Sequence, residues 1–359
     1  MKEGRGRVPP PGELPKGGER FDQGWTFRHF IGLRVRISFA GGPGGAALPC
    51  GFAADQLIMT EPLKIAAVFA TMNRAETAKA CVLALARQTR PPDLVVVADN
   101  CSTDDTVEVL ENLADLPFKL LVRRMPENRG NAGGVEETMD QAFADGADAV
   151  WILDDDSWPR QAALAAMLEG PWDPRMVRHP LQIDPDTDRF TWPLQITDGM
   201  GGWRLAWSEQ DLPEGPRVRS RITWTGALLP KEVREIVGPV NGDLFIRGED
   251  EEYPWRIEQA GFPQEAICGA VMDHPGPKNV VHWQLFGKSF FFERGLADWK
   301  LYYKVRNMVW LKRQQIGNLR AIQMAATYAF AATLIDGPRR IPLLCRAIRD
   351  GWNGHLGRM

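Results

Sequence analysis

The chain has 359 residues, of which 44% are hydrophobic and 25% charged, and its formal net charge is −3. This length allows one large α/β domain or two smaller ones, and the composition is ordinary for a globular protein. Five widely spaced cysteines without a Cys-x-x-Cys pair argue against a disulfide scaffold or a zinc site. No run reaches the ~18 to 20 uninterrupted apolar residues of a membrane span.

Residues 1–60 are rich in Gly, Pro and Arg and show no sustained hydrophobic period. They also lack the compact apolar region of a signal peptide, so they are predicted to form a disordered or poorly ordered N-terminal extension. Met59 lies just before the first regular strand, and we expect it to be the natural start of the protein.

From residue 61 onward, largely apolar strands alternate with segments of helical period. The strands are predicted at 65–70, 94–98, 118–122 and 149–153, and the helices at 75–88, 106–113, 135–144 and 160–168. This alternation predicts a mostly parallel sheet covered by helices on both faces. Sheets of this kind bind ligands beyond the carboxyl ends of their strands.

Polar clusters follow the predicted strands at that edge. They are Thr71-Met-Asn73-Arg74, Asp99-Asn-Cys-Ser-Thr-Asp104, Asn128-Arg-Gly130-Asn-Ala-Gly-Gly134 and Asp154-Asp155-Asp156. Each cluster alone is compatible with ordinary turn chemistry, and the glycine-rich one is neither a G-x-G-x-x-G motif nor a Walker loop. Their convergence on one edge of the sheet predicts a ligand site.

The three adjacent carboxylates Asp154, Asp155 and Asp156 follow a buried strand. Neighbouring like charges repel, so the cluster is best explained by a cation among them; an acidic, solvated turn is the alternative. Mg²⁺ and Mn²⁺ combine one or two carboxylates with phosphate oxygens. A divalent metal that carries a diphosphate is therefore expected.

The second half of the chain is less regular. Residues 170–222 are rich in Pro and Trp and are expected to form strands and loops to which we assign no role. A short strand at 222–230 leads into a predicted helix at 231–237, and a further strand is predicted at 267–272. Between them, Glu249-Asp250-Glu251-Glu252-Tyr253 forms a second acidic centre, which is either the solvated start of a helix or part of a site.

Together these motifs resemble the family-2 glycosyltransferases, most closely the rhamnosyl- and galactofuranosyltransferase branch, across residues 63–315. The resemblance implies an α/β chain with a GT-A fold. A mostly parallel, Rossmann-like nucleotide-binding half (61–169) would join a mixed-sheet acceptor half (170–315), and a basic helical tail (316–359) would follow. It also implies a nucleoside-diphosphate sugar donor, a Mn²⁺ or Mg²⁺ ion and inversion at the anomeric carbon.

The same resemblance implies roles for individual residues on the donor side. The donor-binding residues would be Thr71, Asn73, Arg74, Asp99, Asn128, Gly130, Asp154 and Asp155. Among them, Thr71, Arg74 and Asp99 would hold the nucleoside, and Asp154 would lie on the ribose side. Asp156 would bind the metal, and His274 would complete the metal site, with His282 as the alternative.

On the acceptor side, the resemblance implies that Asp250 is the catalytic base and that Glu249 orients an acceptor hydroxyl. Trp224 offers a flat apolar face to a sugar, although a place in the core is the commoner role of a Trp. Arg306 belongs to the motif Tyr302-Tyr303-Lys-Val-Arg306-Asn307. It would either neutralise the leaving diphosphate or pair with acids of the core.

From Lys300 to the end, eleven Lys and Arg residues face only Asp336 and Asp350, which leaves a charge of +9, and residues 321–335 are largely apolar. Such a tail fits peripheral contact with the inner face of the cytoplasmic membrane. Packing on the catalytic domain, or on a second copy in a homo-oligomer, is the alternative. Nucleic acid is not expected as a partner, because no nucleic-acid motif accompanies the charge.

The combined prediction is a cytoplasmic, metal-dependent, inverting glycosyltransferase. It would move a UDP- or dTDP-linked sugar, such as galactofuranose or rhamnose, to a saccharide or lipid-linked saccharide in cell-envelope polysaccharide synthesis. One alternative is a sugar-1-phosphate nucleotidyltransferase, which is disfavoured because no Gly-rich activation loop follows the first strand. The other is a non-catalytic carbohydrate-binding protein with a decayed site.

Overall fold

The computed structural model describes residues 62–221, 223–277, 279–285 and 288–359. The predicted N-terminal extension, residues 1–60, lies outside the described residues, and so does Met59.

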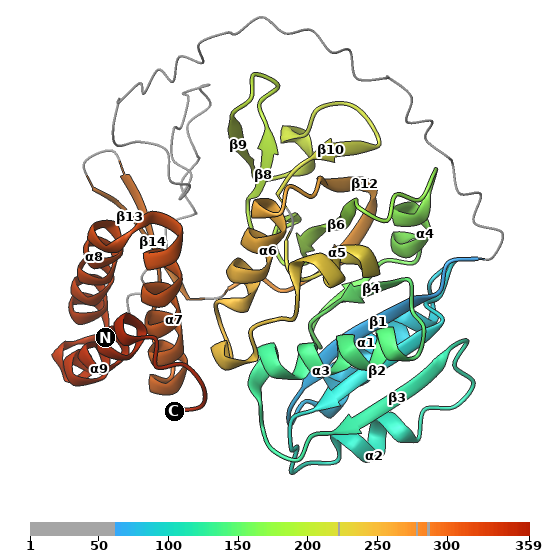
Figure 1. The fold of residues 1–359 in the computed structure, drawn as a ribbon, viewed down its shortest axis with the longest axis horizontal. Helices are drawn as coiled ribbons and strands as arrows, with labels where there is room; N and C mark the ends of the chain where they lie inside the picture. Colours follow the sequence, from blue (N-terminus) through green and yellow to red (C-terminus); the bar gives the residue numbers. More distant parts are fainter. Residues whose placement is uncertain (1–61, 222, 278, 286–287) are drawn as a thin grey trace, which may run out of the picture.

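The centre of the molecule is a mixed sheet with the strand order β10-β12-β6-β11-β4-β1-β2-β3 (Figure 1). Its parallel part comprises β4 (Ala149–Ile152), β1 (Ile65–Thr71), β2 (Leu94–Asp99) and β3 (Lys119–Arg124). Its mixed part comprises β11 (Leu228–Pro230), β6 (Val177–Asp184), β12 (Gln264–Asp273) and β10 (Arg217–Arg219), with the short strands β5 (Trp158–Pro159) and β7 (Arg189–Phe190). Because β11 runs antiparallel to both β4 and β6, it joins the two parts of the sheet. The predicted fold class, an α/β chain with a mostly parallel half and a mixed half, is confirmed.

Helices cover both faces of the parallel part, so its inner strands β4, β1 and β2 are buried along their whole length, whereas the edge strand β3 is only partly buried. Alternate residues separate the two layers: Val68 and Val96 face one layer, and Phe69 and Val97 face the other. The first layer contains α3 (Gly130–Ala144), α5 (Lys231–Val237) and α6 (Glu249–Gln259). The second contains α1 (Ala75–Ala86), α2 (Thr106–Glu111) and α4 (Ala163–Leu168).

The longest strand without predicted bounds is β6, an eight-residue buried strand inside the stretch for which only strands and loops were expected. Pro180 lies in its interior, where a proline normally breaks the ladder. Here the partner strand β12 shifts its register between Ile267 and Val271, directly after the residue paired with Pro180, so the ladder accommodates the missing N–H. The hairpin of β8 (Leu194–Thr197) and β9 (Trp203–Ala206) extends from the same region.

The C-terminal helices form a separate layer beside α6 (Figure 1). They are α7 (Asp298–Ile316), α8 (Asn318–Asp336) and α9 (Ile341–Asn353), accompanied by the hairpin of β13 (Val280–Leu285) and β14 (Lys288–Glu293). Leu301 and Val305 of α7 pack with Leu344 and Ala347 of α9, so α7 shares a hydrophobic cluster with the helices that follow it. None of the helices in the described part has the length and apolarity that a membrane crossing requires.

Candidate functional site

The three acids that follow β4 point in different directions. Asp155 is buried and faces the end of β1, where it accepts a hydrogen bond from Thr71 Oγ1 (2.8 Å) and pairs with Arg74 Nη1 (2.7 Å). Burial raises the pKa of Asp155 to about 6, although the neighbouring Arg74 guanidinium opposes this shift. Asp155 therefore organises the loop, while Asp154 and Asp156 remain partly accessible.

Asp154 and Asp156 meet His274, which follows β12. His274 Nε2 lies 3.6 Å from Asp154 Oδ2 and 3.7 Å from Asp156 Oδ1, and one potential ligand atom of each residue lies within 4.8 Å of the others. His274 Nδ1 is 3.1 Å from the carbonyl of Pro275, so a proton on Nδ1 leaves the Nε2 lone pair facing the two carboxylates. Two carboxylate oxygens and a neutral imidazole nitrogen suit a divalent cation such as Mn²⁺.

Side chains to which the sequence assigned no role support this trio. Thr225 Oγ1 donates to Asp154 Oδ2 (2.7 Å), and Gln182 Nε2 donates to the carbonyl of Thr225 (2.6 Å). Thr191 Oγ1 donates to the carbonyl of His274 (2.8 Å). No local motif marks these residues, because each partner lies more than 40 positions away in the sequence.

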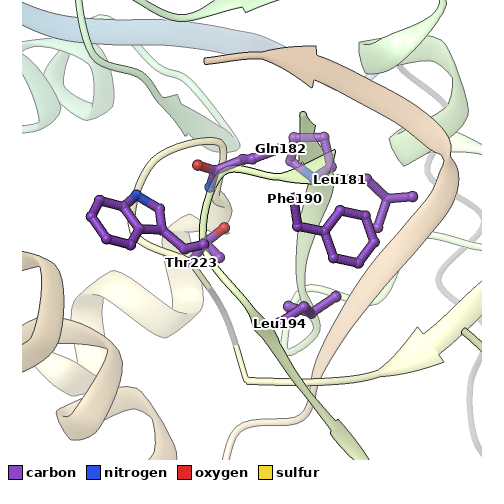
Figure 2. A pocket seen from close by; sticks show the side chains of 7 residues that line it. Leu181, Gln182, Phe190, Leu194 and Thr223 are labelled. Carbon is purple, nitrogen blue, oxygen red and sulfur yellow. The ribbon is translucent and has the colours of Figure 1, made fainter. Parts of the chain in front are cut away.

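A small pocket lies next to this supporting network. Figure 2 shows Gln182 and Thr223 on one side of it and the apolar side chains of Leu181 and Phe190 on the other. Its complete lining is Pro180, Leu181, Gln182, Phe190, Trp192, Leu194 and Thr223. Because Gln182 also holds Thr225, which in turn holds Asp154, the pocket adjoins the acidic cluster.

The residues predicted to hold the nucleoside come together at the ends of β1 and β2. Asp99 is fully buried, and its carboxylate accepts the backbone N–H of Ser102. Asn73 is tied to the same turn, because its N–H donates to Ser102 Oγ (2.8 Å) and its Oδ1 accepts the N–H of Thr103 (2.7 Å). Arg74 reaches from here to Asp156, with Nη2 2.9 Å from Oδ2, and so connects this region with the metal-binding candidates.

The glycine-rich turn forms the first turn of α3, five residues before the predicted helix start. Asn128 Oδ1 accepts the N–H of Gly130 (2.8 Å), which has a positive φ of 68°. A Cβ atom at Gly130 would lie 2.0 Å from the carbonyl oxygen of Phe245. This position therefore needs glycine both for its backbone conformation and for the close approach of the segment before α6.

The second acidic centre is the first turn of α6, and its two leading acids face opposite ways. Glu249 is 3% exposed; its Oε1 accepts from Asn131 Nδ2 (3.0 Å), while Oε2 has no hydrogen-bond partner among the described residues. Burial raises the pKa of Glu249, and the charge of Asp250 adds to the shift. Asp250 is exposed, and its Oδ1 accepts the N–H of Gly248 (2.9 Å). Asp250 is thus the carboxylate that a substrate can reach.

The expected acceptor and leaving-group roles of Trp224, Glu249 and Arg306 do not fit the burial of these side chains, and the role of His282 stays a prediction. Trp224 is 3% exposed and packs edge-on against Tyr253, with ring centroids 5.7 Å apart, so neither Trp224 nor the buried Glu249 offers a surface to an acceptor. Arg306 is 1% exposed and donates to backbone carbonyls, so it does not face a leaving group. His282 lies in β13, and its side chain is outside the described part of the structure.

Comparison with known proteins gives matches in sequence and in structure. The model of the family described as "Glycosyl transferase family 2" matches residues 67–208. The galactofuranosyltransferase GlfT1 of Mycobacterium tuberculosis (strain ATCC 25618 / H37Rv) is 31% identical over 225 residues, which are 60% of this chain and 71% of that protein.

Two solved structures are also similar. GalNAc-T7 with UDP, GalNAc and Mn²⁺ matches with a TM-score of 0.49 and 15% identity over 70% of this chain, and this chain spans 48% of its length. The mannosyltransferase PcManGT from Pyrobaculum calidifontis, in complex with GDP-Man and Mn²⁺, matches with a TM-score of 0.47 and 18% identity, over 84% of this chain and 77% of that chain.

Proposed function

Because this chain belongs to glycosyl transferase family 2, we propose that it transfers a galactofuranosyl or rhamnosyl residue from a UDP- or dTDP-linked donor to a saccharide acceptor, with inversion at the anomeric carbon. The similarity to GlfT1, which is named a galactofuranosyltransferase, favours galactofuranose. The observation that carries the proposal is the cluster at the carboxyl ends of β1 and β4, where Arg74 pairs with Asp156 beside Asp154 and His274.

The donor is proposed to lie along this edge, with its diphosphate at Asp154, Asp156 and His274. These residues would hold a Mn²⁺ or Mg²⁺ ion, and the ion, when bound, would neutralise the charge that develops on the leaving diphosphate. Thr71 and Asp155 keep Arg74 beside the cluster, so its guanidinium adds a fixed positive charge. Asn128 and Gly130 would line the donor from α3.

The metal proposal is tested by the melting temperature of the protein with UDP and with or without MnCl₂. Since a ligand that binds only the folded state raises its stability, UDP with Mn²⁺ is expected to raise the melting temperature of the wild type. Asp156→Asn is expected to lose most of this increase. Asp273→Asn removes a neighbouring carboxylate that pairs with Arg160, and it should keep the increase. An equal increase in all three proteins would contradict this metal site.

The acceptor hydroxyl is proposed to give its proton to Asp250 as its oxygen attacks the anomeric carbon and the diphosphate leaves from the opposite side. Asp250 is suited to this step because it is exposed and fixed by the N–H of Gly248. Asp250→Asn is expected to lower kcat at least ~100-fold, as loss of a general base commonly does, and to keep UDP binding. Binding of donor without turnover in the wild type would instead favour the non-catalytic alternative.

We also propose that α8 places the protein on an anionic membrane surface, where a lipid-linked acceptor would be available. Leu319, Ile322, Phe330 and Leu334 form an apolar stripe along α8 and are 50% to 70% exposed. Residues 316–359 contain six Arg but only two acids, Asp336 and Asp350, and both acids already pair with Arg. An apolar stripe in a cationic segment fits anionic lipid headgroups.

This contact is tested by co-sedimentation with vesicles of phosphatidylcholine alone or with phosphatidylglycerol. Binding is expected only with the anionic lipid, and it should weaken with added salt. The double variant Phe330→Ser, Leu334→Ser should lose binding, whereas Ile236→Ser, an equally exposed apolar residue on α5, should retain it. If the double variant instead converts a dimer into a monomer, the stripe is a subunit interface.

A further inference from the structure

The segment Leu244–Gly248, which leads directly into α6, is held in an unfavourable backbone conformation. Phe245 and Arg247 have positive φ values of 65° and 63°, and Gly248 has a φ of 126°. Side chains of L-residues strongly disfavour this region, so such a conformation persists only where the surroundings hold it. Because Asp250 follows two residues later, whatever holds this segment also fixes the proposed base.

Asn307 of α7 is the side chain that holds it. Asn307 is fully buried, and its Nδ2 donates to the carbonyls of Leu244 (2.9 Å), Ile246 (3.1 Å) and Arg247 (2.6 Å). A Cβ atom at Gly248 would lie only 2.9 Å from Asn307 Cβ, so the two residues are in close contact. One amide group thus lies within hydrogen-bond distance of three carbonyls of the strained turn, of which, among the described residues, only that of Leu244 also accepts a backbone N–H, from Ile246.

Arg306 fixes the orientation of this amide. Its Nε donates to Asn307 Oδ1 (2.8 Å), which leaves Nδ2 directed at the segment. Its Nη2 donates to the carbonyls of Asp243 (3.1 Å) and Leu244 (3.0 Å), and its Nη1 to the carbonyl of Gly357 (2.5 Å). The pair Arg306-Asn307 therefore binds the backbone carbonyls of the segment before α6. This gives a structural role to the end of the motif Tyr302-Tyr303-Lys-Val-Arg306-Asn307, which has no part in the proposed reaction itself.

The other side of the segment contacts the glycine-rich turn. The carbonyl of Phe245 accepts the N–H of Ala132 (3.1 Å), and Glu249 accepts from Asn131. The segment is thus enclosed between α3, which carries the proposed donor residues, and α7. If the contacts with α7 were lost, the Leu244–Gly248 segment would shift, and the distance between Asp250 and the nucleotide-sugar donor would change.

We propose that Asn307 is a positioning residue for the transfer reaction: it acts through the Leu244–Gly248 segment to set the position of Asp250 relative to the donor. This inference rests on the proposed role of Asp250 as the base. Asn307 itself touches neither donor nor acceptor, so its loss should affect kcat and leave the KM for the donor unchanged.

The test uses two variants of Asn307. Asn307→Leu has a similar volume but no hydrogen-bond donor in its side chain, whereas the milder Asn307→Ser retains a hydroxyl that can donate a hydrogen bond. Transfer from UDP-galactofuranose to a synthetic octyl galactofuranoside is followed by UDP release. Asn307→Leu is expected to lower kcat about 100-fold, as small misplacements of catalytic groups do, with the donor KM unchanged. Asn307→Ser should lie between Asn307→Leu and the wild type.

Arg313→Leu is the matched control, because it removes a hydrogen bond of the same helix, from Arg313 Nη1 to the carbonyl of Trp352 in α9, and leaves the Arg306-Asn307 pair in place. It is expected to lower the melting temperature without changing kcat. An equal loss of kcat in Arg313→Leu and Asn307→Leu would overturn the inference, because it would show a general effect of α7 stability. Wild-type kcat in Asn307→Leu would also overturn it.

A double-mutant cycle separates this inference from the proposed function. In the Asp250→Asn background, Asn307→Leu should cause no further loss of turnover, because the two residues act as a unit. A full additional loss would overturn the positioning role while leaving Asp250 as the base. Full turnover in Asp250→Asn alone would instead contradict the proposed base.

Discussion

Glu249 and Asp250 show how much depends on a single step along a helix. Consecutive residues of an α-helix point about 100° apart, so one of two neighbouring acids can face the core while the other faces solvent. The sequence identified the acidic pair by its resemblance to a family motif, but it did not show which acid is buried. That information comes from Asn131 on α3, a partner 118 positions away.

Trp224 and Arg306 illustrate the same limit. An aromatic ring and a guanidinium are typical of sugar and diphosphate sites, and both are also typical of buried packing. Trp224 packs against Tyr253, and Arg306 binds backbone carbonyls. By contrast, the structure does bring together Asp154, Asp156 and His274, because strand ends in one sheet converge on one edge whatever their spacing in the sequence.

The buried Glu249 gives a pH-dependent prediction. Its pKa is raised in the folded protein by burial and by the neighbouring carboxylates of Asp250 and Asp154, so the folded state binds a proton that the unfolded state has released. Stability is therefore expected to fall as the pH rises from the ordinary pKa of Glu to the raised value, by about 1.4 kcal/mol per pH unit.

Glu249→Gln keeps an acceptor for Asn131 and removes the ionisation, so its stability should lack this slope. The free energy of urea unfolding between pH 5 and about 8 checks this, over the range set by the ordinary and raised pKa values. Glu258→Gln alters an acid of the same helix that pairs with Arg221, and it should retain the slope. Equal slopes in the wild type and Glu249→Gln would contradict the prediction.

At the scale of elements, periodicity was sufficient for β1 to β4 and their helices, but it missed β6. The residues Arg178, His179 and Pro180 in its centre are unusual in a buried strand. Each is accommodated by a partner outside β6: Arg178 donates to the carbonyls of Met167 and Pro171, His179 bonds Ser220, and Pro180 lies beside the bulge in β12. Partners of this kind cannot be deduced from local sequence.

Helix α3 offers a matched pair of glycines, because Gly130 begins it and Gly146 follows its end, and both have positive φ. A Cβ atom at Gly146 would make only an ordinary van der Waals contact, 3.7 Å from Lys64 Nζ, so Gly146→Ala should cost only the conformational penalty of about 1 to 2 kcal/mol. Gly130→Ala adds a clash with the Phe245 carbonyl and should cost more. It should also weaken the stabilisation by UDP and Mn²⁺, because the clash displaces the turn that carries Asn128.

Urea unfolding and thermal shift with UDP and MnCl₂ measure both effects. If Gly130→Ala and Gly146→Ala prove equally stable and bind UDP equally well, the close approach of the segment before α6 is not important.

For the whole molecule, contacts cross the predicted boundary of the C-terminal tail. The sequence suggests a catalytic domain that ends at 315 and a basic tail after it, because the composition changes there. In the structure, α9 packs on α7, and the backbone of Gly357 bonds both Arg306 and Asp243. The tail is therefore expected to support the Leu244–Gly248 segment, which precedes Asp250.

A chain that stops after Ile316 is accordingly expected to be insoluble or to lack a cooperative thermal transition, since it would expose Leu301 and Val305 and lose the bonds of Arg306 to Gly357. Removal of residues 1–58 is the control, because the sequence predicts that stretch to be poorly ordered, and this variant should melt like the full chain. Size-exclusion chromatography, circular dichroism melting and UDP release compare the two. A soluble, active chain without residues 317–359 would show that the catalytic unit ends at α7, and the stabilising role of α9 would then have to be abandoned.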